Sequence, residues 1–325
     1  MTDLSTQYMG LTLKSPIIVG SCGLTYSIDT IKKLEANGAA AIVLKSLFEE
    51  QIMLDSDSLK SDFPGHVEEM DYIRGYTRQN AIDEYLALIE KAKKETSIPI
   101  FASVNCISAS DWTLFAKKIE AAGADGIELN MFILPGNIKM ESEEYEQLYF
   151  DIVKKVKKQV TIPIAVKLGF YFTAMANMIC KLSVRDVDAI VLFNRFFRPD
   201  VDIVTQKLIP ADRFSTPQEN ALPLRWIGMV ADKVECDLAA TTGIHDGHTA
   251  IKNILVGASA VQVVSAVYQK GPKVLAEMTD QIIKWMEIHK YNSITDFKGK
   301  LSYDHTKDPL LYDRTQFMKY YSNSE

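Results

Sequence analysis

The chain has 325 residues, of which 47% are hydrophobic, and its formal net charge is −6. This apolar content suits a large core, and the acidic balance without a Lys/Arg cluster argues against a nucleic-acid partner. The first residues lack the apolar core of a signal peptide, and no apolar run is long enough to span a bilayer, so we expect a soluble cytoplasmic protein.

Eight apolar segments are rich in Val, Ile and Ala, which is typical of strands buried on both faces of a parallel sheet. In chain order they span residues 15–21, 40–45, 97–104, 125–130, 161–168, 187–194, 236–241 and 259–265. Helical apolar spacing lies between them, for example in residues 27–37, 80–95 and 108–122. The alternation predicts a (β/α)8 TIM barrel. A doubly wound open sheet is the alternative, although the Gly-rich fingerprint expected after its first strand is missing.

The chain also resembles itself internally. The segments NGAAAIVLK, AGADGIELN and VGASAVQVVS each place a Gly before Ala and an apolar strand. Such a Gly fits the left-handed end of a helix, after which the chain turns into a strand. This repetition favours the barrel.

Two connections are long, at residues 46–79 after the second predicted strand and 195–217 after the sixth. Both leave the carboxyl end of a strand, where barrel enzymes carry their active sites, so we expect both to border the site. No linker divides the chain. We therefore predict one domain over residues 1–325, with the barrel at about 11–290 and a C-terminal appendage at about 291–325.

Four predicted strands carry a polar side chain at or near their carboxyl ends. These are Lys45, Asn130, Lys167 and Asn194. Singly, each has a structural explanation: a rim lysine reaching solvent, an ion pair of Lys167 with Glu128, or an amide that fixes a loop. Together, two lysines and two amides favour a site for an electron-rich ligand.

The segment ATTGIHDG, residues 240–247, is a candidate phosphate site. Gly243 allows close backbone approach, and Gly247 opens a helix whose first amides would face an anion. The segment follows the seventh predicted strand, and Ser265 with Ala266 follows the eighth, which is where barrels commonly bind phosphate. By contrast, neither the cysteines nor the histidines have the spacing of a metal site, so we predict none.

From about Leu11 to Leu301 the sequence resembles the class 1 dihydroorotate dehydrogenases. The resemblance rests on Lys45–Ser46, Glu128–Asn130, Val166–Phe172, the GASAVQV segment and, most specifically, Tyr291–Leu301. It implies a (β/α)8 barrel that binds FMN, a small-molecule substrate and a homodimer. By resemblance, the cofactor-binding residues would be Ser21, Cys22, Lys45, Asn130, Lys167, Thr242, Gly243, Ser265 and Ala266, and the substrate-binding residues Lys45, Asn130 and Asn194. Independently of the resemblance, we expect Arg74 to bind a carboxylate of the substrate.

The sequence departs from the family pattern at the substrate. Ile133 stands where the family has its Cys base, and Pro135 stands where it has a substrate-binding Asn. On the lid, the family's N-S-M-G segment corresponds to residues 72–75 here. The substrate pocket is therefore expected to be rebuilt, and the sequence names no catalytic residue.

Three hypotheses follow for the function. The first is an FMN-dependent oxidoreductase of the CH–CH class with a rebuilt substrate pocket, whose substrate is not established by the sequence. The second is dihydroorotate oxidation, as in pyrimidine biosynthesis, with a base supplied by Cys22 or Cys106. The third is a non-catalytic FMN-binding barrel that serves as a partner or sensor.

Overall fold

Eight parallel strands close into a barrel in the computed structural model, which describes residues 2–55, 81–196 and 198–313. The ring closes because β4 pairs with both β3 and β6, and this closure confirms the predicted TIM barrel and excludes the open sheet. Its strands, in order around the ring, are β3 (Ile17–Val19), β4 (Ala41–Val43), β6 (Ile100–Cys106), β7 (Gly126–Met131), β8 (Ile164–Leu168), β9 (Ala189–Leu192), β12 (Asp237–Thr241) and β13 (Ala260–Val263).

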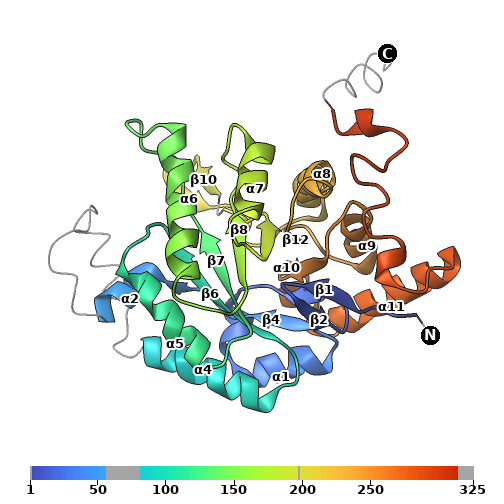
Figure 1. Cartoon of the computed structure of the whole chain (residues 1–325), viewed down its shortest axis with the longest axis horizontal. Coiled ribbons are helices and arrows are strands. Elements are labelled where there is room, and N and C mark those ends of the chain that lie inside the picture. Colours follow the sequence, from blue (N-terminus) through green and yellow to red (C-terminus); the bar gives the residue numbers. More distant parts are fainter. Residues whose placement is uncertain (1, 56–80, 197, 314–325) are drawn as a thin grey trace.

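The helices surround this ring of strands (Figure 1). Their apolar faces pack on the outer face of the barrel, as the spacing of Ile31 and Leu34 or of Ile82 and Ile89 predicts. The predicted helix at 108–122 is divided into a 3-10 turn at Asp111–Leu114 and a short α-helix. The α-helices are α1 (Ile28–Ala36), α2 (Glu49–Asp55), α4 (Ala81–Glu95), α5 (Phe115–Ala121), α6 (Ser142–Lys157), α7 (Met175–Ser183), α8 (Ala221–Val230), α9 (Gly247–Leu255), α10 (Ser265–Lys270) and α11 (Val274–His289).

The amino end of the barrel is closed by a hairpin of β1 (Thr6–Tyr8) and β2 (Leu11–Leu13). Tyr8 and Leu13 are buried in one apolar cluster with Phe101 and with small residues of the strands, such as Ala165 and Ala239. Small side chains inside the barrel leave room for these larger ones. A ligand site is therefore confined to the opposite, carboxyl end of the strands.

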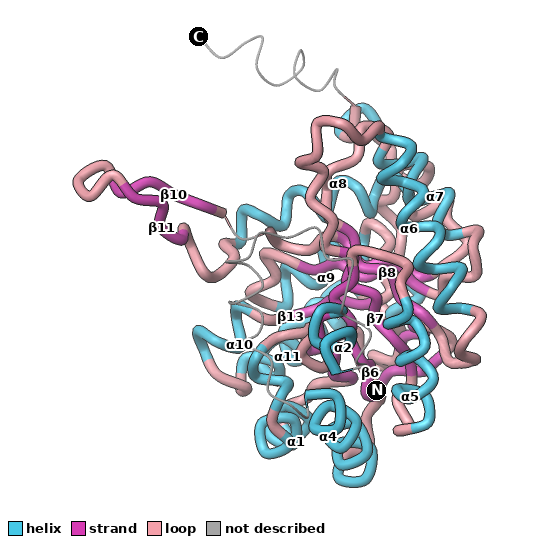
Figure 2. The backbone as a smooth tube through the Cα atoms, turned by 90° about the vertical axis from the view of Figure 1, so that its left-hand side faces the viewer, coloured by secondary structure: helices cyan, strands magenta, loops and turns pink. Residues whose placement is uncertain are grey.

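The two long connections contain secondary structure of their own. After β4 come β5 (Leu47–Phe48), which pairs with β6, and the helix α2. After β9 comes an antiparallel hairpin of β10 (Pro199–Asp202) and β11 (Lys207–Pro210), which protrudes from the body of the molecule (Figure 2). Its apolar side chains are exposed, with Ile203, Val204 and Leu208 each more than three-quarters accessible.

The predicted C-terminal appendage packs on the barrel where it is described. The amides of Gly299 and Leu301 donate to the carbonyls of Ile254 and Leu255 at the end of α9, at 3.0 and 2.8 Å. The amide of Tyr303 donates to Gly228 in α8 at 2.8 Å. In residues 2–55, 81–196 and 198–313 no helix is both long and apolar enough to cross a membrane.

Candidate functional site

Lys167 lies in the barrel interior at the carboxyl end of β8 and is almost fully buried. Its ammonium group is 3.5 Å from Glu128 Oε1 and donates to Gln262 Oε1 at 3.1 Å, and the Gln262 amide also donates to Glu128. The ion pair with Glu128, one of the two alternatives for Lys167, is therefore present. The same lysine also lines a cavity, so its charge is available to a ligand as well.

The two asparagines of the site are joined in one hydrogen-bond chain. Asn194 Nδ2 donates to Asn130 Oδ1 at 2.6 Å, and Asn130 Nδ2 lies 3.5 Å from Ser46 Oγ. Ser46 Oγ in turn is 3.1 Å from the hydroxyl of Ser21 and 2.8 Å from that of Ser103. Each amide is hydrogen-bonded to the next side chain in this series. These hydrogen bonds fix which side of Asn130 and of Asn194 faces a ligand.

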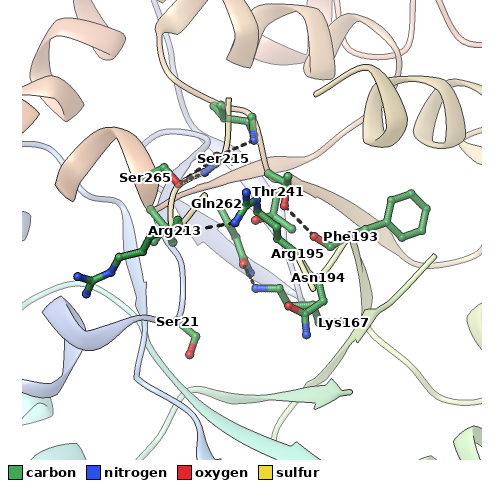
Figure 3. A pocket seen from close by; sticks show the side chains of 14 residues that line it. Ser21, Lys167, Phe193, Asn194, Arg195, Arg213, Ser215, Thr241, Gln262 and Ser265 are labelled. Atoms are coloured by element: carbon green, nitrogen blue, oxygen red, sulfur yellow. Dashed lines mark hydrogen bonds between the residues drawn. The ribbon is translucent and has the colours of Figure 1, made fainter. Parts of the chain in front are cut away.

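A cavity of about 230 Å³ opens beside these residues at the barrel mouth. Figure 3 shows Ser215 and Ser265 at one end of it and Lys167 with Asn194 at the other. Such a cavity suits an elongated ligand with one end on a cation and the other on hydroxyl groups. Its lining residues are Ser21, Lys167, Phe193, Asn194, Arg195, Arg213, Ser215, Thr241, Thr242, Gly243, Ile244, Gln262, Val264 and Ser265.

The hydroxyl end of the cavity is organised by Ser215. Its Oγ accepts from the amide of Gly243 at 3.2 Å and donates to Ser265 Oγ at 3.0 Å, while its amide donates to the same oxygen at 3.0 Å. Since Ser265 Oγ accepts two hydrogen bonds, its own proton is directed to a further acceptor. The buried His245 adds Nε2 at 3.3 Å from Ser215 Oγ.

Gly243 is the backbone position that makes this end possible. Its φ is +75°, and a Cβ there would lie 2.4 Å from the backbone nitrogen of Asn220. Only glycine fits both constraints. Thr242, which also has a positive φ, donates its hydroxyl to the carbonyl of Phe193 and so ties the turn to the end of β9.

Several predicted site residues are not among those that line this cavity. Lys45 is half-buried, with its ammonium group 5.3 Å from the centre of the Tyr26 ring. Cys22 precedes the short 3-10 turn Gly23–Tyr26, and Ala266 is fully buried in α10. Arg74 and the rest of the lid segment 72–75 lie outside the described residues.

The candidate bases offered by the sequence are unsuited to proton abstraction. Ile133, which the family resemblance matches to the base, is buried and aliphatic. Burial raises the pKa of the Cys22 thiol, and it raises that of the fully buried Cys106 well above its usual range. Because their pKa values are raised, both thiols stay protonated near neutral pH. A general base works best when its pKa lies near the ambient pH, so neither thiol suits that role.

Sequence reasoning missed some residues that line or support the cavity. Gln262 is the single amide in an apolar strand, and that exception was a usable signal. Arg195 directly follows Asn194 and donates to both carboxylate oxygens of Glu219, each at 3.2 Å. No sequence pattern identifies Ser215 as a site residue. It lies in the long connection before α8, and only the folded course of that connection brings it to the cavity.

The chain is similar to known proteins along most of its length. The family model for dihydroorotate dehydrogenase matches residues 3–286. The chain belongs to the dihydroorotate dehydrogenase family. Dihydroorotate dehydrogenase B (NAD(+)), catalytic subunit, of Thermoplasma volcanium is 28% identical over 312 residues, which cover 92% of this chain and 98% of the relative. Dihydroorotate dehydrogenase A (fumarate) of Lactococcus lactis subsp. cremoris is 26% identical over 321 residues, covering 92% and 99%.

These dihydroorotate dehydrogenases span two named types, one described with NAD(+) and one with fumarate. Another relative, the NAD(+)-type catalytic subunit of Methanocaldococcus jannaschii, is 27% identical over 298 residues, covering 87% of this chain and 94% of the relative. Relatives of both named types therefore match this chain over at least 94% of their own length.

Proposed function

We propose that the chain is an FMN-dependent oxidoreductase acting on CH–CH groups, as in the dihydroorotate dehydrogenase family. The observation that carries the proposal is the cavity at the barrel mouth. It has a buried cation, Lys167, at one end and the turn of Gly243 with the hydroxyls of Ser215 and Ser265 at the other. A flavin mononucleotide has the matching ends, an electron-accepting ring and a phosphate.

The residues present fit this group chemically. The proton of Ser265 Oγ, left without an acceptor inside the Ser215 cluster, suits a phosphate oxygen. Gly243, which also lines the cavity, leaves the turn beside it without a side chain. FMN, when bound, supplies the capacity to accept or donate a hydride. Lys167 would stabilise negative charge on the reduced ring, because a buried cation acts strongly in a medium of low dielectric constant.

The other roles are assigned on the same basis. Ser21, Cys22 and Thr242, from the loops that follow β3 and β12, and Ala266, at the start of α10, would complete the cofactor site. Asn130 and Asn194 would orient the substrate, and their mutual hydrogen bond keeps both amides in place. Lys45 and Arg74 are proposed as further substrate contacts.

We further propose that the substrate differs from dihydroorotate. The support is Ile133 at the base position, together with thiols whose pKa values are raised by burial at Cys22 and Cys106. Loss of a general base costs about 10²–10⁴-fold in rate. Turnover of dihydroorotate at ordinary family rates would contradict this part of the proposal.

The deciding experiment is the visible absorbance spectrum of the purified protein, followed by anaerobic titration with candidate substrates. We expect a flavin spectrum that bleaches with a suitable donor. A colourless protein that does not take up added FMN would overturn the proposal. A protein that binds FMN but is reduced by no donor would favour the non-catalytic alternative.

We also propose a single-domain, cytoplasmic homodimer. The support for self-association is the protruding hairpin β10–β11, whose apolar side chains are exposed in the single chain. Light scattering across a concentration series tests this, with Leu208→Glu expected to shift a dimer to a monomer. A wild-type protein that is monomeric throughout the series would contradict it.

A further inference from the structure

A second cavity, of about 310 Å³, lies against the first on the side of β8 and β9. The two cavities share Phe193, Asn194, Arg195 and Thr242 as lining residues. A molecule in the second cavity would therefore be separated from a molecule in the first by one layer of side chains at most. A volume of this size is at the lower end for small-molecule sites, which suits a ligand with a single ring.

The walls of the second cavity are aromatic. Phe170 and Tyr171 have ring centres 4.5 Å apart, and the Tyr171 ring meets Phe196 edge to face at 4.8 Å. Phe132, from the loop after β7, stacks on Phe196 with centres 4.0 Å apart and an angle of 18° between the rings. This cluster joins three loops at the barrel mouth, so its arrangement is preformed.

Two of these rings remain exposed to solvent. Phe170 is 38% accessible and Tyr171 is 40% accessible, although both line the cavity wall. Covering exposed aromatic faces with a flat apolar group is favourable, because apolar surface is removed from water. Stacking of the rings stabilises the complex beyond the effect of the buried area. The wall therefore selects a planar ring over a polar, non-planar one.

The polar part of the cavity carries net positive charge. Arg195 and Arg198 both donate to Glu219, Arg198 through one nitrogen at 2.8 Å. One carboxylate against two guanidinium groups leaves one positive charge without a counterion within this trio. Arg195 is 17% exposed and also donates through Nη1 to two backbone carbonyls, whereas the Arg198 side chain is 64% exposed and has further donors. The planar guanidinium group of Arg198 matches the geometry of a carboxylate, which accepts two parallel hydrogen bonds from such a group.

We propose that the second cavity binds a single-ring aromatic carboxylate, with the ring on Phe170 and Tyr171 and the carboxylate on Arg198. The ligand site stands on the cavity, the rings and the charges. Its further assignment as the substrate site rests on the proposed function, because only a bound flavin in the first cavity would make this neighbour a reactant.

Calorimetric titration of the purified, flavin-loaded protein with trans-cinnamate tests the binding. We expect saturable binding, with cinnamyl alcohol, which keeps the ring but lacks the charge, weaker by about tenfold or more. Cyclohexanecarboxylate, which keeps the charge but lacks the flat ring, should also be weaker. Equal binding of all three ligands, or no binding of cinnamate, would overturn the assignment.

Two surface variants locate the site. Arg198→Gln and Tyr171→Ala should each weaken cinnamate binding about tenfold, since one removes a charge-assisted bond and the other a stacking face. Lys207→Gln, on the exposed strand β11, is the matched control for charge and should leave binding unchanged. If Lys207→Gln weakens cinnamate binding as much as Arg198→Gln does, the ligand responds to the overall positive charge of the surface. The proposed site would then be wrong.

The flavin absorbance of the same samples separates this inference from the proposed function. Cinnamate binding that depends on Arg198 and Tyr171 in a protein without flavin would support the ligand site while overturning the proposed function. A flavin-loaded protein that is bleached by another donor but does not bind cinnamate would overturn the ligand site alone.

Discussion

At the scale of single residues, Lys167 joins the core of the barrel to its ligand cavity. Its ammonium group and the carboxylate of Glu128 are both nearly inaccessible to solvent. A buried ion pair contributes little net stability compared with apolar residues, but removing one partner leaves a charge without compensation. The lysine is therefore constrained by the fold as well as by any ligand.

Lys167→Met should lower the free energy of unfolding by about 3 kcal/mol, because it leaves Glu128 charged and buried. The double variant Glu128→Gln with Lys167→Met should recover much of this loss. Urea denaturation of the two variants and of Glu128→Gln alone completes the cycle. A double variant as unstable as Lys167→Met would mean that the pair is not coupled.

His245 gives the fold a predictable dependence on acid. Burial is the largest cause, and it holds the pKa of His245 below the ordinary 6.5. The Ser215 backbone hydrogen bond comes next and opposes this effect, the positive charge of Lys270 adds to the lowering, and Asp246 and Glu219 have smaller raising effects. The unfolded chain takes up a proton at this histidine as the pH falls through 6.5, while the folded chain resists it.

The free energy of unfolding should therefore decrease as the pH drops below 6.5. The decrease is at most about 1.4 kcal/mol for each unit by which the pKa of His245 differs between the unfolded and folded states. Denaturation curves of the wild type and His245→Asn at several pH values check this. The variant should lose less stability on acidification. Parallel pH profiles for the two proteins would show that His245 is not responsible.

At the scale of elements, the turn between β12 and α9 decides the shape of the hydroxyl end. Gly243→Ala should lower the free energy of unfolding by more than about 2 kcal/mol, since a positive φ and a contact with Asn220 both oppose the added methyl group. It should also weaken FMN uptake. Gly136→Ala is the control, because no atom lies within 4 Å of its added Cβ. Similar unfolding curves for the two variants would contradict the prediction.

At the scale of the whole molecule, ligand binding and folding are linked. If FMN binds the folded chain alone, a concentration one hundred times its Kd should raise the free energy of unfolding by about 2.7 kcal/mol. Riboflavin at the same concentration should stabilise less, because it lacks the phosphate for Ser265 and the Gly243 turn. Thermal unfolding of the apoprotein with each compound measures the difference, and equal shifts would exclude a phosphate site there.

The sequence by itself determined the barrel, because eight continuous apolar segments alternating with helical patterns have few other ways to bury both faces of each strand. It also singled out Asn130, Lys167 and Asn194, since strand ends converge at one face in such a fold. The tertiary structure decided which residues meet. Gln262 reaches Glu128 and Ser215 joins Ser265, although these pairs are 134 and 50 residues apart in the chain, and Arg198 joins Glu219 within the long connection after β9. Such contacts depend on loop paths and side-chain packing, which local sequence patterns do not encode.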